Sequence, residues 1–124
     1  MVAPVERIFS EDEANSLLPQ LTQLLTQLQR AHTEFRATER TAQRRAASNG
    51  AVSSAPADNA GAEYLRLLGE LNGLGILVRD PEAGLVDFPA VRHGDPVYLC
   101  WRLGEDGIGF WHPRDTGFTG REPL

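Results

Sequence analysis

The longest periodic pattern of apolar residues lies near the start of the chain and repeats at alternating intervals of four and three positions. Its members are Ala14, Leu18, Leu21, Leu25, Leu28, His32 and Phe35. This spacing places them on one face of an amphipathic α-helix. Just before it, Ser10 and Glu13 have the spacing of a capping box, in which each side chain binds the other's backbone amide. We therefore predict a long N-terminal helical segment within residues 1–47, kinked at Pro19.

A stretch of small and polar residues separates this helix from a second, shorter apolar pattern. Residues 48–62 are almost free of bulky side chains and cannot bury enough surface to repay their ordering, so we interpret them as a flexible loop. Helical spacing returns at Tyr64, Leu67, Leu68, Leu71 and Leu74. It predicts a second helix over residues 62–75, which ends in a left-handed cap at Gly75.

Between residues 76 and 112 the apolar positions form short runs separated by turn residues. The runs cover residues 76–79, 85–88, 97–103 and 108–112. Their lengths and short connections are typical of antiparallel β-strands. With 124 residues, the chain is expected to form a single domain of the α+β class. We predict a long antiparallel helical hairpin packed on a small four-stranded antiparallel meander, followed by a tail over residues 113–124.

The alternation of side chains along these strands predicts which residues face the helices. In the first hairpin we expect Val78 opposite Val86, and in the second Leu103 opposite Ile108. The second pairing turns His112 toward the helices. On the opposite face, the same pairing places side chains that an ordinary solvated face would not need. They are Tyr98, Cys100, Arg102 and Trp111. We expect the tail or a partner to cover that face.

Composition narrows the classes of partner. The formal net charge of -5 argues against general binding to polyanions. The basic run Arg36–Arg45 is interrupted by Glu34 and Glu39, so we interpret it as a solvated helix end and do not expect nucleic acid. No apolar run approaches the length of a membrane span, and the first residues lack the pattern of a signal peptide. The expected compartment is the cytoplasm, without a membrane partner.

The residues with catalytic or metal-binding side chains are scattered. C-x-x-C, H-E-x-x-H, Walker A and G-x-S-x-G motifs are missing from the sequence. A metal would have to draw on Asp87, His93, Asp95, Glu105 and His112, with Asp87, Glu105 and His112 as the first candidates. Because these histidines share no helix-face spacing, we predict neither a metal site nor a cofactor. The expected register separates Cys100 from His112, so we interpret Cys100 as an inert buried thiol.

Several motifs resemble those of the uncharacterised prokaryotic DUF2203 family. They are F-S-x-x-E-A-N-x-L-L-P at 9–19, G-L-V-D-F-P-A at 84–90, V-Y-L-C-W-R-L-G-E at 97–105, W-H at 111–112, G-F at 117–118 and G-R at 120–121. The resemblance covers nearly the whole chain except residues 48–62. It supports the fold unit but implies no reaction. This chain has Pro113 where the resemblance leads us to expect an acid after Trp-His, which weakens any scheme that needs a carboxylate there.

The sequence is compatible with three functional hypotheses. The leading hypothesis is a non-enzymatic protein-interaction or scaffolding module with an unknown protein partner. The second is a small enzyme or anionic-ligand or metal binder, and the third an RNA-associated protein that uses Arg36–Arg45. The candidate binding residues are Asp87, Tyr98, Arg102, Glu105, Trp111, His112 and Arg121. For the arginines, we favour ion pairs that pin the tail to the sheet over an anion clamp.

The first helix also suggests self-association. Its apolar seam spans about 22 residues, while the second helix can cover only about 13 of them. Leu17, Leu24 and Ala31 widen the seam on one flank. We therefore predict a homodimer through the first helix, since pairing identical helices would bury those residues. In the alternative, the helix lies diagonally over the sheet and the whole stripe is used within a monomer.

Overall fold

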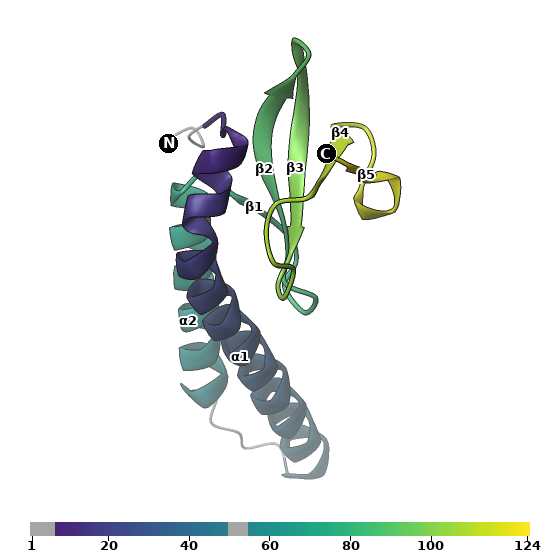
Figure 1. Cartoon of the computed structure of the whole chain (residues 1–124). Coiled ribbons are helices and arrows are strands. Elements are labelled where there is room, and N and C mark those ends of the chain that lie inside the picture. Colours follow the sequence, from purple (N-terminus) through teal and green to yellow (C-terminus); the bar gives the residue numbers. More distant parts are fainter. Residues whose placement is uncertain (1–6, 50–54) are drawn as a thin grey trace, which may run out of the picture.

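The computed structural model describes residues 7–49 and 55–124, with the side chains of 7–45 and 59–124 (Figure 1). Its elements are α1 (Glu11–Asn49), α2 (Ala55–Gly73), β1 (Leu77–Asp80), β2 (Leu85–Arg92), β3 (Asp95–Arg102), β4 (Phe110–Pro113), the short 3-10 helix η1 (Phe118–Gly120) and β5 (Glu122–Pro123). The strands form one antiparallel sheet in the order β1-β2-β3-β4-β5. The predicted α+β class is confirmed.

The sheet has five strands, which corrects the prediction of a four-stranded sheet. The tail turns back after η1, and β5 pairs with β4 through Phe110 with Pro123 and Trp111 with Glu122. An isolated strand of two residues has no apolar alternation by which it could be recognised in a sequence. The tail therefore adds an edge strand to the sheet.

The start of α1 follows the sequence closely. The amide of Glu13 donates to Oγ of Ser10 at 3.1 Å, and the amide of Ser10 donates to Oε1 of Glu13 at 3.2 Å, which is the predicted capping box. The helix continues through Pro19 without a break. None of the helices in the described part of the chain has the length and apolar content needed to cross a membrane.

The predicted loop over residues 48–62 is too long. Residues 48–49 belong to α1 and residues 55–62 to α2, while 50–54 lie outside the described residues. Gly61, one of the small residues that suggested a loop, instead allows a close helix contact. A side chain at Gly61 would meet the Phe35 ring at 3.2 Å. At the other end, α2 stops at Gly73, and Gly75 adopts the expected left-handed conformation with φ of 87°.

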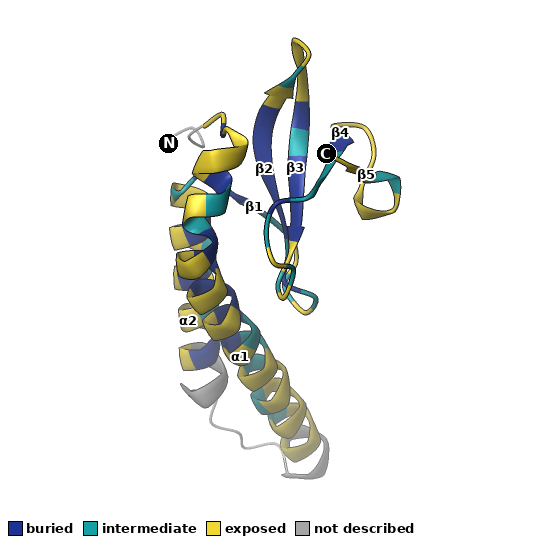
Figure 2. Ribbon diagram, in the orientation of Figure 1, coloured by how far each residue is buried: buried dark blue, intermediate teal, exposed yellow. Residues whose placement is uncertain are grey.

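The two helices lie side by side and cover one face of the sheet, while η1 and β5 lie on the side away from them (Figure 1). We call these the helix-facing side and the far face. One apolar core joins the helices to the helix-facing side (Figure 2). Its fully buried large side chains include Phe9, Leu21, Leu25, Leu28, Leu67, Leu71, Ile76, Val86, Phe88 and Trp101.

The apolar stripe of α1 is used within one chain. Leu24 and Ala31 are buried, and Leu17 is half-buried and packs against the core. The leucines that the homodimer was expected to cover are thus already covered by α2 and the sheet. The homodimer itself stays a prediction, but it loses this reason.

The register of the first hairpin is confirmed, with Val78 opposite Val86. The register between β3 and β4 differs from the prediction by one residue, because Leu99 pairs with Trp111 and not with His112. Ile108 was expected to pair with Leu103, but its amide donates to Oδ1 of Asn15 on α1 at 2.9 Å and its side chain is buried in the core. This tertiary contact fixes where β4 begins.

A shift of one residue exchanges the two faces of a strand. His112 therefore lies on the far face, and Trp111 lies on the helix-facing side, half-buried beside the core. Both assignments are the reverse of the prediction. The exchange brings His112 to the same face as Cys100 and is the main reason that the far face differs from the expected one.

Candidate functional site

Neighbouring strands bring three buried side chains of different chemistry together on the far face. Asp87 of β2 pairs with Cys100 of β3, and His112 of β4 lies across from Tyr98. Asp87, Cys100 and His112 are only 2%, 1% and 2% exposed. A carboxylate oxygen, the sulfur and a ring nitrogen of these residues all lie within 4.8 Å of one another. We call these three residues the far-face cluster. The prediction that Cys100 and His112 lie on opposite faces is therefore wrong.

Asp87 binds a partner through each carboxylate oxygen. Its Oδ1 lies 3.0 Å from Nε2 of His112, and its Oδ2 accepts a hydrogen bond from Nε of Arg79 at 2.9 Å. The other ring nitrogen, Nδ1 of His112, lies 2.8 Å from the carbonyl oxygen of Pro113. A carbonyl can only accept, so Nδ1 carries a hydrogen. Both ring nitrogens thus face acceptors, and the arrangement is fully hydrogen-bonded when both carry hydrogen.

The Cys100 thiol is held in its protonated form. Burial raises the pKa of Cys100 to about 11, the carboxylate of Asp87 adds to the increase, and Arg121 partly offsets it. A thiol with such a pKa is a weak nucleophile at neutral pH. The interpretation of Cys100 as a buried thiol is confirmed, although its neighbours are polar.

A second polar contact, between Arg121 and Glu105, holds the tail beside the cluster. The guanidinium of Arg121 donates to both carboxylate oxygens of Glu105, at 3.0 Å each. It also stacks on the rings of Phe110 and Phe118, at 3.9 and 4.3 Å from their centroids. Burial would raise the pKa of Glu105, but hydrogen bonds from Arg121 and from the Arg102 amide outweigh it and hold the pKa below its ordinary value. The predicted pinning of the tail by an ion pair is found here.

A cleft of about 320 Å³ opens beside the cluster, between β2 and the segment after β4. Its lining consists of Arg79, Leu85, Asp87, Arg114, Thr116, Gly117 and Phe118. The guanidinium groups of Arg79 and Arg114 lie 5.0 and 4.8 Å from the ring centroid of Tyr98. Arg114 makes no ion pair with any residue whose side chain the structure describes.

The predicted site residues divide into three groups. Asp87, His112 and Tyr98 lie together, the last two with ring centroids 5.5 Å apart. Glu105 and Arg121 form the neighbouring ion pair, whereas the Arg102 side chain is exposed. Trp111 does not belong to the site, because it lies on the helix-facing side under Arg92, whose guanidinium is 4.9 Å from its ring.

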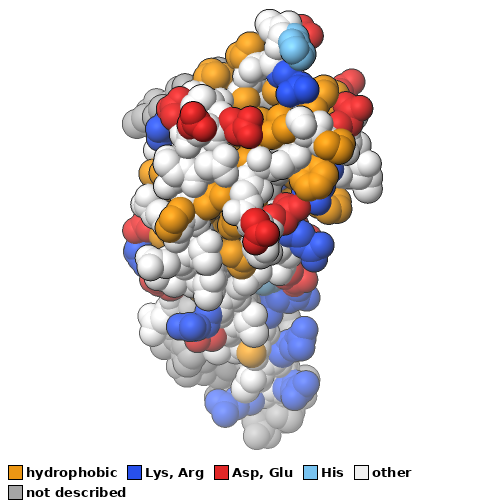
Figure 3. All heavy atoms as spheres, viewed as in Figure 1, with side chains coloured by type: hydrophobic (Ala, Val, Ile, Leu, Met, Phe, Trp, Pro, Cys, Tyr) orange, Lys and Arg blue, Asp and Glu red, His pale blue; other side chains and the backbone are white. Residues whose placement is uncertain are grey.

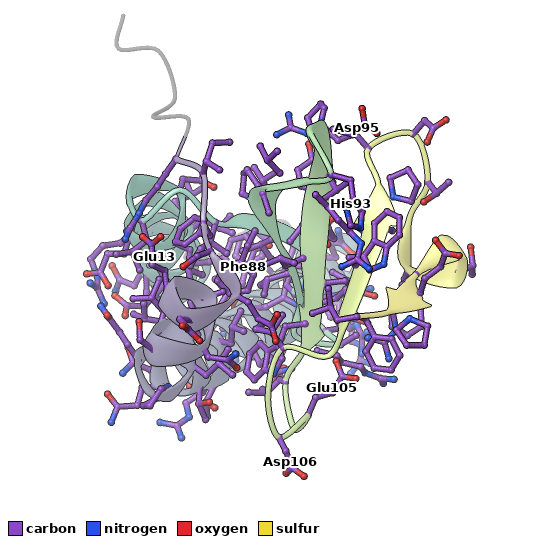
Figure 4. The ribbon with its side chains drawn as sticks, turned by 45° about the horizontal axis from the view of Figure 1, so that its top comes forward. Glu13, Phe88, His93, Asp95, Glu105 and Asp106 are labelled. Atoms are coloured by element: carbon purple, nitrogen blue, oxygen red, sulfur yellow. The ribbon has the colours of Figure 1, made fainter. Side chains whose placement is uncertain are left out.

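The remaining metal candidates are not brought together. His93 and Asp95 lie at one end of the β2–β3 hairpin, and Glu105 lies at the other end (Figure 4). The third potential metal ligand beside Asp87 and His112 is Cys100, and not Glu105 as the sequence suggested. Sequence reasoning also missed Arg79 and Arg114. For Arg79 a signal existed, since Leu77 opposite Asp87 puts the next alternate residue on the same face. Arg114 follows the last residue of β4 and carries no such signal.

The basic run of α1 forms a separate surface. Figure 3 shows basic side chains gathered over the C-terminal half of α1. The run begins with an ion pair, because Nη1 of Arg36 donates to Oε1 of Glu82 at 2.7 Å. Glu82 lies between β1 and β2, so its pair with Arg36 links α1 to the sheet and partly neutralises the run.

Comparison with known proteins gives one positive result. A search of curated proteins and a search of solved structures each found no match to this chain. A scan against protein-family models matched residues 7–124, which includes β5 and every residue of the far-face cluster. The matched motifs contribute Asp87, Cys100, Glu105, His112 and Arg121 to one region of the far face. The chain belongs to the family described as Uncharacterized conserved protein (DUF2203).

Proposed function

We propose that the protein binds a small anionic ligand in the cleft between β2 and the segment after β4. The observation that carries this proposal is Arg114, a guanidinium on the cleft wall without an ion-pair partner among the described side chains. Scaffolding through the far face has less support, because Trp111 points away from that face and the segment after β4 lies across the cleft from Asp87.

The two arginines of the cleft suit a carboxylate or phosphate group. A guanidinium is a planar fork that can bind such a group through two parallel hydrogen bonds. Both guanidinium groups rest near the Tyr98 ring, which limits the side-chain freedom that binding would cost. Arg79 is already engaged in part, because its Nε donates to Asp87 and its side chain also interacts with Tyr98, so Arg114 offers the freer guanidinium.

The apolar part of the lining sets the size and character of the ligand. Leu85 and Phe118 form walls of the cleft beside the arginines. A volume of about 320 Å³ is at the small end of the range for ligand sites, roughly 300–1,000 Å³. The ligand class that fits is a small acid with one compact apolar or aromatic group.

Calorimetric titration with phenyl phosphate and with inorganic phosphate tests the proposal. We expect phenyl phosphate to bind more tightly, and Arg114→Gln to weaken it by about tenfold or more, as the loss of one charge-assisted pair predicts. Arg30→Gln is the matched control, because Arg30 is an exposed arginine of α1 outside the cleft. Equal affinities for the two variants, or no binding to the wild type, would reject an anion site in this cleft.

Self-association is a second candidate, favoured by an apolar hollow of about 730 Å³ between the helices. Its lining is His32, Phe35, Arg36, Gly61, Ala62, Tyr64 and Leu65. Leu65 is 67% exposed beside it, a position that a second copy of the chain would cover. Light scattering should then give twice the monomer mass of 13.6 kDa, reduced to the monomer by Leu65→Glu but not by Val91→Glu on the sheet. A monomeric wild type would exclude it.

A further inference from the structure

The far-face cluster contains one thiol, one imidazole and one carboxylate, each from a different strand and each almost fully buried. No residue of the proposed anion contact, Arg79 or Arg114, is a member of it. A hydrogen-bonded Asp–His pair does not need a cysteine beside it. The convergence of three different metal-ligand types at one buried point is the feature that calls for a separate explanation.

The orientation of the groups matches that of metal ligands. Nδ1 of His112 is committed to the Pro113 carbonyl, which directs Nε2 toward the cluster. Metal-bound histidines typically donate their second N–H to a carbonyl or carboxylate in this way. Asp87 likewise keeps Oδ2 on Arg79 and turns Oδ1 toward Nε2. Asp87 and His112 therefore each turn one atom toward the other and have a second atom fixed by an outer partner, and the cysteine sulfur lies within 4.8 Å of both residues.

We propose that Oδ1 of Asp87, Sγ of Cys100 and Nε2 of His112 bind one divalent transition metal ion of the zinc type. Thiolate and imidazole together favour zinc or cobalt over magnesium and calcium. Bond lengths of about 2.0–2.3 Å in a tetrahedral site place ligand atoms about 3.3–3.8 Å apart. A carboxylate oxygen of Asp87, the sulfur of Cys100 and a ring nitrogen of His112 lie within 4.8 Å of one another, and Oδ1 and Nε2 are 3.0 Å apart, so shifts of several tenths of an ångström to about 1 Å complete the site.

The balance of charge favours the replacement of two protons by one divalent metal ion. In the fully hydrogen-bonded arrangement, with hydrogen on both ring nitrogens of His112 and on the Cys100 thiol, the charges of the metal-free cluster sum to zero. The ion displaces one proton from Nε2 of His112 and one from Sγ of Cys100, and both protons pass to solvent. With metal, the ion, the carboxylate, the thiolate and the neutral imidazole again sum to zero. Binding therefore adds no net charge to a buried site, where an uncompensated charge would be costly.

The fourth coordination position links this site to the cleft. Asp87 belongs to the cluster and also lines the cleft, so water or a bound anion in the cleft would reach the ion from that side. This link alone rests on the proposed function. Metal binding is measured without any anion, and anion binding is tested at Arg114, so one proposal can fail while the other holds.

Cobalt titration of metal-free, tag-free protein tests the site. We expect one equivalent of Co²⁺ to bind, with a thiolate-to-cobalt charge-transfer band in the near ultraviolet, and one equivalent of Zn²⁺ to displace it. Cys100→Ser should remove the band. His32→Gln is the matched control, because it removes a half-buried histidine beside Glu82 and should leave the band unchanged. A wild type without the band, or a serine variant that keeps it, would overturn the proposal.

X-ray absorption of the zinc-loaded wild type gives a second test that needs no folded variant. We expect one sulfur neighbour of zinc at about 2.3 Å together with lighter ligands at about 2.0–2.2 Å. A spectrum with only nitrogen and oxygen neighbours would show that zinc binds elsewhere on the chain and would reject this site.

Discussion

The two sides of the central sheet are buried to a similar degree by different physical means. On the helix-facing side, Phe88, Leu99 and Trp101 are excluded from water by apolar neighbours. On the far face, Asp87 and His112 are equally inaccessible, but their neighbours are polar, namely each other, Arg79 and the Pro113 carbonyl. Among the described residues, no buried side-chain nitrogen or oxygen lacks a hydrogen-bond partner. The same strands thus carry an apolar core on one side and a polar network on the other.

The difference lies in how each side should fail. Apolar packing has no fixed partners, so damage grows with the volume removed. In a buried polar network each group depends on a particular partner, and loss of one leaves another uncompensated. Substitutions on the two sides should therefore be distinguished less by their size than by whether their effects add.

The largest effect is expected on the helix-facing side, from Phe88→Ala. Phe88 is fully buried and packs edge-to-face on Phe9, with ring centroids 5.3 Å apart. Loss of its ring should lower the free energy of unfolding by about 4 kcal/mol through lost burial and a residual cavity. Urea denaturation followed by circular dichroism measures this. A loss below about 1 kcal/mol would mean that the helices do not depend on this side of the sheet.

On the far face, Asp87→Ala should cost about 3 kcal/mol, because it leaves the buried His112 without its partner. A double-mutant cycle with His112→Ala sharpens the comparison. The two changes should be non-additive, since the second removes the group that the first left uncompensated. If the measured losses simply add, the pair is not a coupled unit, and the distinction between the two sides fails.

A smaller effect is expected from Glu105→Gln, which weakens the link to Arg121 and should cost about 1 kcal/mol at neutral pH. The pKa of Glu105 is lowered on folding, so its contribution is present above the ordinary value of 4.5 and is lost as pH falls through the folded value. The difference in stability between the wild type and the variant should therefore shrink below about pH 4.5. A difference that stays constant in acid would contradict the assigned role.

The smallest expected effect on stability at neutral pH comes from the titration of Cys100. At that pH its thiol is protonated in both the folded and the unfolded chain. Its pKa rises from 9.0 to about 11 on folding, so this contribution is complete below pH 9 and is lost as pH rises toward 11. Alkylation by iodoacetamide at pH 8, followed by mass spectrometry, should be at least about tenfold slower in the folded protein than in urea. Equal rates would show that the tail does not shield the thiol.

Local signals made much of the fold predictable. The cap at Ser10 depends on residues three positions apart, and the pairing of Val78 with Val86 depends on a short connection. Both can be inferred from neighbouring residues alone. The family resemblance agreed with the family-model match over almost the whole chain. Gly61 of α2 was misinterpreted because its lack of a side chain leaves room for Phe35, which lies far away in the sequence.

The candidate site was predicted only in part, and the reason is one distant hydrogen bond. Asn15 of α1 binds the amide of Ile108 and so sets the register of β4, which alternation within residues 97–112 could not reveal. The predicted residues Asp87 and His112 belong to the site, but the pairing error separated His112 from Cys100. Arg79 was within reach of the sequence argument, whereas Arg114 depends on the path of the chain after β4.

That same hydrogen bond has a consequence for the order in which the protein assembles during synthesis. The N-terminal end of α1 is anchored by Asn15 to Ile108, 93 positions later, and the Phe9 amide just before the helix donates to the Pro89 carbonyl at 2.7 Å. A ribosome makes this end of the helix well before either partner, Pro89 or Ile108, has been made. The α1–α2 hairpin relies on nearer contacts and can form earlier. The N-terminal end of α1 is therefore made before the α1–α2 hairpin is complete but is fastened in place after it.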